Sequence, residues 1–306
     1  MAGLADLRDD LRSLVHGLGH LARERVPVGP LTTYRVGGEA AVFVELSSDE
    51  DLDRLLRVLS PLSVPVLVLG KGSNLLVSDA GFAGVCVRLG EAYSHVEIDG
   101  SDLTAGGACA YPVVARRSAA SGLTGLEWAV GVPGSVGGGV RMNAGGHGAE
   151  TSELLLAARV VDLGTGEDRW RPPAELELSY RHSAVRPSDL VLHARYALEA
   201  GDAEESSRQI ADIVRWRRQN QPGGQNAGSV FTNPPGDSAG RIIEQVGLKG
   251  YRIGTAMVSD KHANFIQADA GGSADDVRRV IEAVKGQVSD RLGIELAVEL
   301  RLVGWA

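Results

Sequence analysis

The chain has 306 residues, 43% hydrophobic and 23% charged, which is a composition typical of soluble proteins and a length that allows two or three domains with a sizeable core. Its net charge of −8 lacks the basic excess that binds nucleic-acid phosphates, so we expect no nucleic-acid partner. No apolar run approaches membrane-spanning length, and acidic residues lie where a signal peptide would be basic. We therefore expect no membrane association and a cytoplasmic location. Cys86 and Cys109, among small and apolar residues without C-x-x-C spacing, favour buried thiols in a reducing compartment.

The first ninety residues alternate between helical and strand-like patterns. Leucines at helical spacing predict an amphipathic helix over the first twenty residues, namely Leu4, Leu7, Leu11, Leu14 and Leu18. Strands are expected over residues 40–46, 64–70, 75–79 and 85–89. Ser47 and Glu50 have the spacing of a capping box and predict a helix that ends before Pro61.

Residues 125–148, GLEWAVGVPGSVGGGVRMNAGGHG, stand out for their glycine content. Each glycine raises the entropy cost of ordering, so we expect a loop here rather than a helix or strand. Such a backbone can bring its N–H groups up to an extended anion such as a pyrophosphate, and the simplest ligand is a dinucleotide. The alternative is a glycine-rich surface linker, which would not need the apolar residues Trp128, Val130, Val132 and Val136.

A second glycine loop, Gly70–Asn74, follows an apolar strand about sixty residues earlier. Two such loops suit a cofactor with two phosphates. Neither loop has the G-x-G-x-x-G spacing of a Rossmann site or the glycine spacing of a P-loop. The sequence therefore predicts a dinucleotide site of another kind.

The later chain begins with a short helix framed by Pro112 and Gly122, and short strands with turns follow over residues 154–198. A polar stretch at 200–205 predicts a domain boundary. Asp237 is expected to cap a helix that stops at Gly247, and Ser273 a longer helix that ends at Gly293. The alternation in residues 294–303 predicts a last strand with Glu295, Glu299 and Arg301 on one face.

Eight blocks in order resemble the UDP-N-acetylenolpyruvoylglucosamine reductase (MurB) family: TTYRVGG, LGKGSNLLVSD, GVPGSVGGGVRMNAGGHG, YRHS, NAGSVFTNP, AGRIIEQVGLKG, VSDKHANF and VELRLVG. The resemblance implies an α+β fold in which a two-subdomain FAD-binding module of the PCMH/VAO type precedes a C-terminal α+β substrate-binding domain. The corresponding division is 1–28 for an N-terminal helix, 29–200 for the FAD-binding domain with subdomains 29–85 and 86–200, and 201–306 for the last domain. The chain lacks the inserted tyrosine-bearing loop, which places it in the shorter subclass.

The resemblance also implies an activity. Non-covalent FAD, reduced by NADPH, would deliver hydride to UDP-N-acetylglucosamine enolpyruvate and give UDP-N-acetylmuramate for peptidoglycan synthesis, and thereby serve cell wall biogenesis, cell shape and cell division. The partner is this small-molecule substrate, and we expect a monomer without a bound metal.

Three residues match the family's catalytic positions. Arg181 and Glu299 would stabilise charge on the substrate carboxylate, with Glu299 protonated or sharing a proton, and Ser229 would donate a proton to the α-carbon. The implied cofactor contacts are Tyr34, Gly70, Lys71, Gly72, Ser73, Asn74, Leu75, Gly131, Val132, Pro133, Gly134, Ser135, Gly137, Gly138, Asn143, Ala144, Gly145 and Arg181. The implied substrate contacts are Arg217, Asn233 and Arg301, with Arg218 an equal contender to Arg217.

Other residues invite different interpretations. His262 is expected to be a hydrogen-bonded structural histidine rather than an acid. Thr232 and Gln267 depart from residues common in the family, which leaves open a silent paralogue that binds FAD or a UDP-sugar as a sensor. Another flavin oxidase on the same fold is the second alternative, although it would not explain the combination of Arg181, Ser229 and Glu299.

Overall fold

The computed structural model describes residues 4–305, which divide into two units built from alternating stretches of the chain. Unit 1 holds the chain up to Val26, Ala41–Lys71 and Gly84–Trp216. Unit 2 holds Pro27–Ala40, Gly72–Ala83 and the chain from Arg217 onward.

This division differs from the borders at 28/29 and 200/201 that the sequence suggested. Two early segments contribute Tyr34, Val36 and Leu76 to the core that the C-terminal elements form in unit 2. Ile210, which lies beyond the expected border, packs into a core of unit 1. The units interleave because hydrophobic burial joins side chains irrespective of their distance along the chain.

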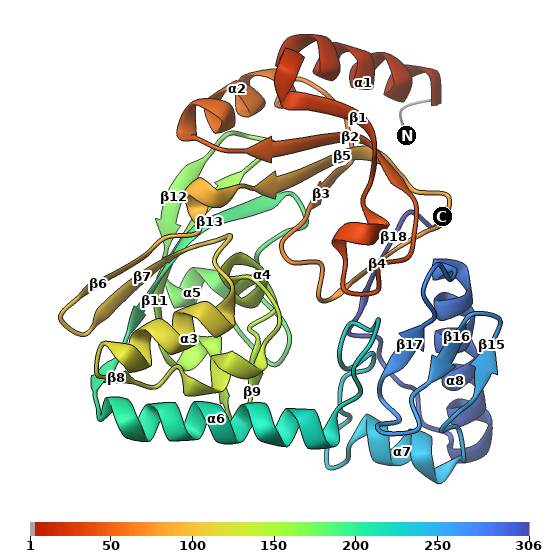
Figure 1. Cartoon of the computed structure of the whole chain (residues 1–306). Helices are drawn as coiled ribbons and strands as arrows, with labels where there is room; N and C mark the ends of the chain where they lie inside the picture. Colours follow the sequence, from red (N-terminus) through yellow and green to blue (C-terminus); the bar gives the residue numbers. More distant parts are fainter. Residues whose placement is uncertain (1–3, 306) are drawn as a thin grey trace. The chain divides into compact units, whose positions relative to one another are not determined.

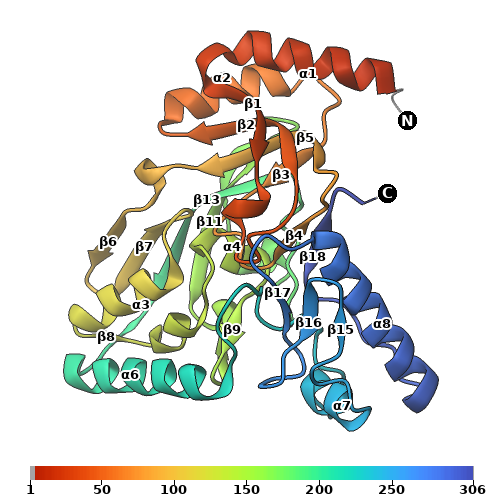
Figure 2. The ribbon, with the colours of Figure 1, turned by 45° about the vertical axis from the view of Figure 1, so that its right-hand side comes forward.

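The first core of unit 1 lies between two helices and a four-stranded sheet of order β1-β2-β5-β3. Figures 1 and 2 show α1 and α2 lying side by side over this sheet. The bounds are α1 Leu4–Leu18, α2 Asp49–Leu59, β1 Ala22–Pro27, β2 Glu39–Leu46, β3 Val66–Val68 and β5 Phe82–Leu89. Burial of Leu14 and Leu18 confirms the amphipathic first helix, while the side chains of Leu4 and Leu7 lie outside the described ones.

Two local expectations in this region need correction. Helix α2 is capped by Ser48, whose side chain accepts from the Asp51 N–H, and Asp51 in turn accepts from the Ser47 N–H. The cap therefore lies one residue later than predicted. Asp51 rather than Glu50 reaches back, and it accepts from the N–H of the residue before the cap, so the reciprocal pairing of a capping box is not made. The expected subdomain border at 85/86 falls inside β5, where Val85 and Cys86 pair in parallel with β3.

The second core of unit 1 lies on an antiparallel sheet of order β12-β11-β13-β7-β6. Helices α3, α4 and α6 contribute to this core, and Figure 1 shows α3 and α6 below the sheet. The helix bounds are α3 Tyr111–Ala120, α4 Val136–Arg141, α5 Pro173–Leu176 and α6 Ala203–Asn220. The strand bounds are β6 Val96–Asp99, β7 Asp102–Gly106, β11 Leu155–Asp162, β12 Asp168–Arg171 and β13 Asp189–Ala197. Two short pairs complete the unit, β8 Leu123–Thr124 with β14 Glu199–Ala200 and β9 Gly145–Gly146 with β10 Ala149–Glu150.

The glycine-rich segment 125–148 is not the continuous loop that its composition predicts. It contains a 3-10 turn and the helix α4, whose sequence VGGGVR includes three glycines. A Cβ at Gly139 would lie 1.8 Å from the Tyr111 ring, so close packing against that ring requires glycine within the helix. Tertiary contact thus overrides the low helix propensity of the segment. The apolar anchors Trp128, Val130 and Val136 are buried as expected.

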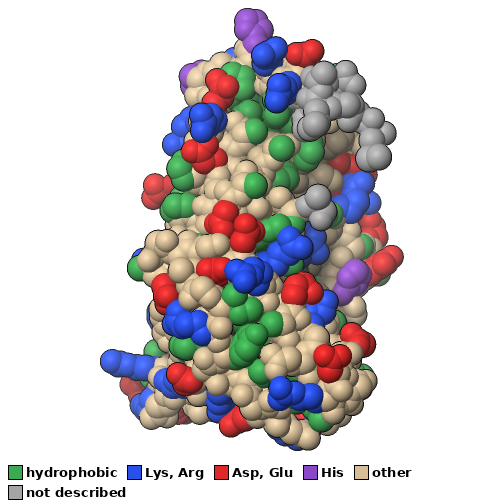
Figure 3. All heavy atoms as spheres, turned by 90° about the vertical axis from the view of Figure 1, so that its right-hand side faces the viewer, with side chains coloured by type: hydrophobic (Ala, Val, Ile, Leu, Met, Phe, Trp, Pro, Cys, Tyr) green, Lys and Arg blue, Asp and Glu red, His purple; other side chains and the backbone are tan. Residues whose placement is uncertain are grey.

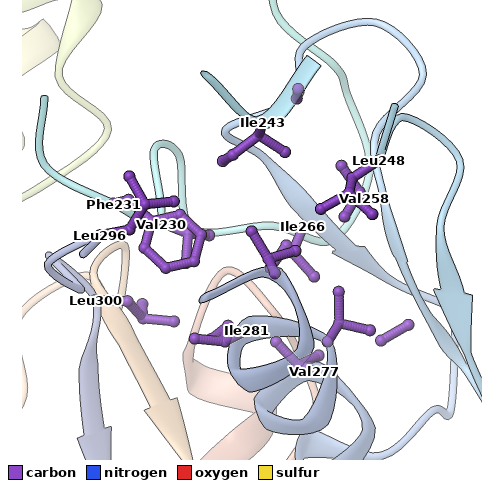
Figure 4. Packing of buried hydrophobic residues seen from close by; sticks show 14 of the residues in the cluster. Val230, Phe231, Ile243, Leu248, Val258, Ile266, Val277, Ile281, Leu296 and Leu300 are labelled. Atoms are coloured by element: carbon purple, nitrogen blue, oxygen red, sulfur yellow. The ribbon is translucent and has the colours of Figure 1, made fainter. Parts of the chain in front are cut away.

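Unit 2 has one core around the long helix α8 and the small sheet β15-β16-β17. Figure 4 shows Val277 and Ile281 of α8 in one cluster with Ile266, Val230 and Phe231. The bounds are α7 Ala239–Gln245, α8 Ala274–Leu292, β15 Arg252–Ile253, β16 Ala256–Val258, β17 Ile266–Ala268, β4 Leu75–Val77 and β18 Arg301–Val303. Strand β18 runs parallel to β4.

The caps of the late helices were partly predicted. Ser273 caps α8 and Gly293 ends it in the left-handed conformation, as expected. Helix α7 is capped by Ser238 rather than Asp237, which pairs with Arg241 instead.

The last strand is shorter than the residues 294–303 that the sequence predicted. Burial alternates as far as Leu300, but only Arg301–Val303 forms a strand, and Leu302 is 36% exposed. The backbone of residues 294–300 instead contacts the chain near Phe231 through a single bridge at Val298.

Basic and acidic side chains are mixed on the surface. On the face drawn in Figure 3, the described basic and acidic side chains are interspersed. None of the described helices is long and apolar enough to cross a membrane.

Candidate functional site

The two predicted glycine loops meet in unit 1. A Cβ added to Gly70 would lie 2.4 Å from Oγ of Ser135. The two loops can therefore approach this closely only because residue 70 is a glycine. The second loop is fixed from behind: the Val136 N–H donates to the Cys109 carbonyl at 2.9 Å, and the Gly137 N–H donates to the Gly107 carbonyl at 2.9 Å. The loop backbone is therefore ordered by the protein itself.

Several main-chain N–H groups at this contact have no acceptor among the described residues. Within residues 4–305, main-chain hydrogen bonds are donated neither by Gly70–Asn74 nor by Gly134 or Ser135. The Lys71 ammonium is close enough to lower the pKa of the Cys109 thiol, although burial is the larger effect and raises that pKa. Open N–H groups, close backbone approach and a cation are what a pyrophosphate requires, so these residues fit the FAD cradle expected here.

Among the described residues, three buried side-chain atoms lack a hydrogen-bond partner, namely Tyr34 Oη, Trp128 Nε1 and Arg171 Nε. Tyr34 lies in unit 2 and Trp128 in unit 1. Burial raises the pKa of Tyr34 above its usual range, so its hydroxyl stays neutral. Such groups cost free energy when they are left unsatisfied, and a bound ligand is one way to satisfy them.

Arg181 lies in unit 1 on a tight turn. Its φ is +56°, and its neighbours Ser179 and His182 form a bridge across the turn. The guanidinium donates to the Gly145 carbonyl at 3.0 Å and lies over the Tyr180 ring at 4.9 Å. The side chain is half-buried, and its charge is thus held in place from two sides.

Asn143, predicted to contact the cofactor, has its side chain committed to protein groups. It is fully buried, and Nδ2 donates to the Ser179 carbonyl at 3.1 Å and to the Glu150 carboxylate at 2.9 Å. Its Oδ1 accepts from the Ser152 N–H at 2.9 Å. The side chain of Asn143 therefore ties the glycine segment to the turn that carries Arg181.

The chain after Arg181 is anchored by ion pairs between an exposed arginine and two buried carboxylates. The Arg186 guanidinium bonds the buried carboxylates of Asp162 at 2.6 Å and Asp189 at 2.8 Å. Burial opposes ionisation of Asp162, but hydrogen bonds from Arg186 and from the Gly164 N–H outweigh it and lower its pKa to about 2. The carboxylate stays ionised at neutral pH, and the pair fixes the loop.

Unit 2 brings Ser229, Glu299 and Asn74 together. The Glu299 N–H donates to the carbonyl of Val230, which follows Ser229, at 2.8 Å. The Glu299 carbonyl accepts from Asn74 Nδ2 at 3.2 Å, and the Arg301 N–H donates to the Asn74 carbonyl at 3.2 Å. Asn74, a predicted cofactor contact, thus hydrogen-bonds the main chain of Glu299, a predicted catalytic residue. Ser229 and Glu299 are both half-buried.

The structure separates the two candidate arginines at the end of α6. Arg217 is half-buried, and burial alone lowers its pKa. Its Nε donates to the Gln221 side chain at 2.7 Å, and no carboxylate within residues 4–305 pairs with it. Arg218 is exposed, and its carbonyl accepts from the Lys261 ammonium at 2.8 Å. A partly desolvated cation without a counter-ion favours Arg217 as the anion ligand.

The other predicted substrate contacts are less shielded. Asn233 is exposed, and its Oδ1 accepts from the Ala239 N–H at the start of α7. Arg301 is exposed as well.

His262 and the two residues that depart from the family pattern, Thr232 and Gln267, have local partners. His262 accepts from the Asn264 N–H through Nδ1, contacts the Phe265 ring, and has a pKa lowered by burial, as a structural histidine should. Thr232 donates its N–H to the Ala297 carbonyl at 3.0 Å, and Gln267 donates to the Gly223 carbonyl at 2.9 Å.

Sequence reasoning missed one residue near the site. Asn264 is 3% exposed, and its side-chain amide bonds both main-chain groups of Phe231, two residues after Ser229. The HANF block contained the signal, since a buried asparagine needs polar partners, but the partner segment lies 33 residues away.

Comparison with known proteins agrees with this geometry. Residues 40–170 match the model of an FAD binding domain, and residues 219–303 match the model described as UDP-N-acetylenolpyruvoylglucosamine reductase, C-terminal domain. A UDP-N-acetylenolpyruvoylglucosamine reductase of Rubrobacter xylanophilus is 42% identical over 286 residues, covering 91% of this chain and 94% of that protein. The Bacillus subtilis reductase is 38% identical and covers 91% and 92%. The crystal structure of the enzyme from Thermus caldophilus superposes with a TM-score of 0.81 at 36% identity, over 92% of this chain and 100% of that one.

The fold and the glycine cradle define an FAD-dependent oxidoreductase with an added C-terminal domain. Within that class, the chain belongs to the UDP-N-acetylenolpyruvoylglucosamine reductase family. The family, the α+β fold with its FAD-binding module, and the use of FAD with NADPH are as the sequence predicted.

Proposed function

We propose that the chain reduces the enolpyruvyl group of UDP-N-acetylglucosamine enolpyruvate to the lactyl ether of UDP-N-acetylmuramate, with Arg181, Ser229 and Glu299 as catalytic residues. Bound FAD, itself reduced by NADPH, supplies the hydride that adds to the β-carbon. The observation that carries this assignment is the 2.8 Å bond from the Glu299 N–H to the Val230 carbonyl, which joins the segments of the proton donor and the carboxyl. The product serves peptidoglycan precursor synthesis.

Charge on the substrate must be stabilised while the β-carbon accepts hydride. Electrons of the double bond move to the α-carbon and into the attached carboxylate, so the transition state carries more negative charge there than the substrate does. Arg181 offers a permanent cation whose direction is fixed by Gly145 and Tyr180. Glu299 serves this role in its protonated form, in which it donates a hydrogen bond instead of repelling the anion.

The α-carbon must then receive a proton, and Ser229 is suited to give it. Its hydroxyl makes no hydrogen bond to the protein within residues 4–305, so it is available to a ligand. A serine donates effectively only when its alkoxide is stabilised, which is a second reason to propose that Glu299 acts in its protonated form.

The remaining contacts are assigned by chemistry. We infer that Arg217 binds the diphosphate of the substrate because it is the partly desolvated member of the arginine pair. Asn233 and Arg301 remain proposed substrate contacts. For FAD we propose the open N–H groups of Gly70–Asn74, Gly134 and Ser135, together with Tyr34. Gly131, Val132 and Pro133 remain proposed cofactor contacts. The cytoplasmic, monomeric state expected from the sequence stays part of this proposal.

An anaerobic stopped-flow experiment on the FAD-loaded protein tests the function in two halves. NADPH should bleach the flavin absorbance, and UDP-N-acetylglucosamine enolpyruvate should then restore it without oxygen. Bleaching without recovery would overturn the reductase assignment and favour the silent paralogue. Recovery with a small alcohol oxidation product, but not with the UDP-sugar, would favour another flavin oxidase.

A further inference from the structure

Asn264 belongs to none of the groups that bind cofactor or substrate, yet it is one of two buried asparagines in the described chain. Its Oδ1 accepts from the Phe231 N–H at 2.9 Å, and its Nδ2 donates to the Phe231 carbonyl at 2.8 Å. An N–H can only donate and a carbonyl can only accept, so this pairing fixes the orientation of the amide. Its own carbonyl also accepts from the Val230 N–H at 2.9 Å.

These bonds leave nothing free on the two residues after Ser229. Val230 and Phe231 have four main-chain polar groups, and three of them bond Asn264. The fourth, the Val230 carbonyl, accepts from the Glu299 N–H. Asn264 and Glu299 therefore hold the same segment from different sides, and the position of one bears on the position of the other.

The side chains of the same segment cannot provide this fixation alone. Figure 4 shows Val230 and Phe231 in the apolar cluster with Leu296 and Leu300, where packing sets their depth but not the direction of the backbone. On the other side of Ser229, Gly228 has a φ of +77° and its N–H is held by the Asn226 side chain. A directional restraint after Ser229 comes from the buried amide.

We propose that Asn264 is a positioning residue that aims the Ser229 hydroxyl at the α-carbon of the substrate. This inference rests on the proposed role of Ser229. Proton transfer depends steeply on distance and angle, and a displacement of about 1 Å can cost about 10²-fold in rate. Hydride transfer from NADPH to the flavin does not involve Ser229 and should not depend on Asn264.

The substitution Asn264→Asp keeps the shape of the side chain and removes the hydrogen bond to the Phe231 carbonyl. The carboxylate can still accept from the Phe231 N–H, but it cannot donate to the Phe231 carbonyl, and the two oxygens repel. We expect reoxidation of the reduced flavin by substrate to slow by about 10- to 100-fold, while reduction by NADPH keeps the wild-type rate. The rate relative to wild type should recover as pH falls, because the introduced carboxyl group regains an O–H donor when it is protonated.

Two comparisons separate positioning from general destabilisation. Ile281→Val, in the core of α8, should weaken unit 2 without changing either rate. In a Ser229→Ala background, Asn264→Asp should change reoxidation by less than about twofold, since residues that act as one unit are not additive. Asn264→Gln serves as a second variant if Asn264→Asp fails to bind FAD.

The outcomes test separately the positioning role of Asn264 and the proton-donor role of Ser229. Equal slowing of both half-reactions by Asn264→Asp, multiplicative effects in the double variant, or no pH recovery would overturn the positioning role. Wild-type reoxidation by Ser229→Ala would instead overturn the proposed role of Ser229, whatever Asn264→Asp does. Slow Ser229→Ala with wild-type Asn264→Asp would leave the function standing and remove only this inference.

Discussion

The turn that carries Arg181 and the irregular segment that carries Ser229 are held by different kinds of interaction. In unit 1 the turn is bracketed by charged groups: Asn143 links it to the Glu150 carboxylate, and Arg186 pairs with buried Asp162 after it. In unit 2 the backbone after Ser229 is held by a neutral side-chain amide and by main-chain groups.

The difference matches what each residue has to do. A guanidinium attracts anions from several directions, so its turn can be fixed by ion pairs and a strained φ as long as the charge stays near the substrate. A hydroxyl that gives up a proton needs a defined distance and angle, and directional hydrogen bonds provide these better than charges do. The two segments should therefore respond differently to substitution and to pH.

Among the arginine substitutions, replacing Arg181 should have the largest effect. Arg181→Met removes the cation and the bond to Gly145, and we expect flavin reoxidation by substrate to fall by about 10²- to 10³-fold. Arg181→Lys should lose less, because charge is kept while the fixed direction is lost. Single-turnover stopped flow measures both. A Lys variant as slow as the Met variant would show that direction, not charge, governs this position.

Acid should destabilise the loop of unit 1 that Asp162 and Arg186 hold. The surface pair of Arg241 and Asp237 in unit 2 should contribute nothing measurable to stability at any pH. Asp162 has a pKa lowered from 3.8 to about 2, so its contribution to stability is complete above pH 4 and is lost as pH falls toward 2. That contribution is roughly 2 kcal/mol. Urea unfolding of the FAD-loaded protein at pH 7, 4 and 2.5 should show the loss, and Arg186→Met should lower stability already at pH 7.

The matched control is Arg241→Met. The Arg241 and Asp237 pair also holds the pKa of its carboxylate at about 2, but it lies on the surface, where solvent screens it. We expect no measurable change in the urea midpoint from this variant. Equal losses from both arginine variants would mean that burial of Asp162 and Asp189 adds nothing to the pairing.

The smallest effect is expected from the arginines at the end of α6. Arg217→Gln should raise the KM for the UDP-sugar about tenfold with little change in kcat, a loss of about 1.4 kcal/mol in binding. Arg218→Gln should leave KM within about twofold, because its exposed side chain is already hydrated. Steady-state assays decide, and a larger effect at Arg218 would reverse the assignment drawn from burial.

Much of the fold could be predicted because its signals are local. The leucine stripe of α1 and the caps Ser273 and Gly293 of α8 depend only on spacing and on side chains that bond nearby backbone. The capping errors at Ser48 and Ser238 are one-residue shifts where two candidates stand side by side. Local rules do not choose between such neighbours.

What could not be predicted depends on distant contacts. The glycine helix α4 forms because Tyr111 lies against Gly139, and its composition alone argues against a helix. The role of Asn264 depends on Phe231, and the interleaved units depend on Tyr34, Val36 and Leu76. The candidate site came from the resemblance of motifs, whereas the separation of Arg217 from Arg218 needed the burial that only the structure provides.

Ser229→Ala in a double-mixing stopped-flow experiment is the most direct test of the account. The FAD-loaded variant is first reduced with NADPH and then mixed with UDP-N-acetylglucosamine enolpyruvate without oxygen. We predict reduction at the wild-type rate and reoxidation slower by about 10³-fold, within the range that a positioned acid contributes. Equal slowing of both steps, or reoxidation at the wild-type rate, would contradict the assignment of Ser229 as the proton donor.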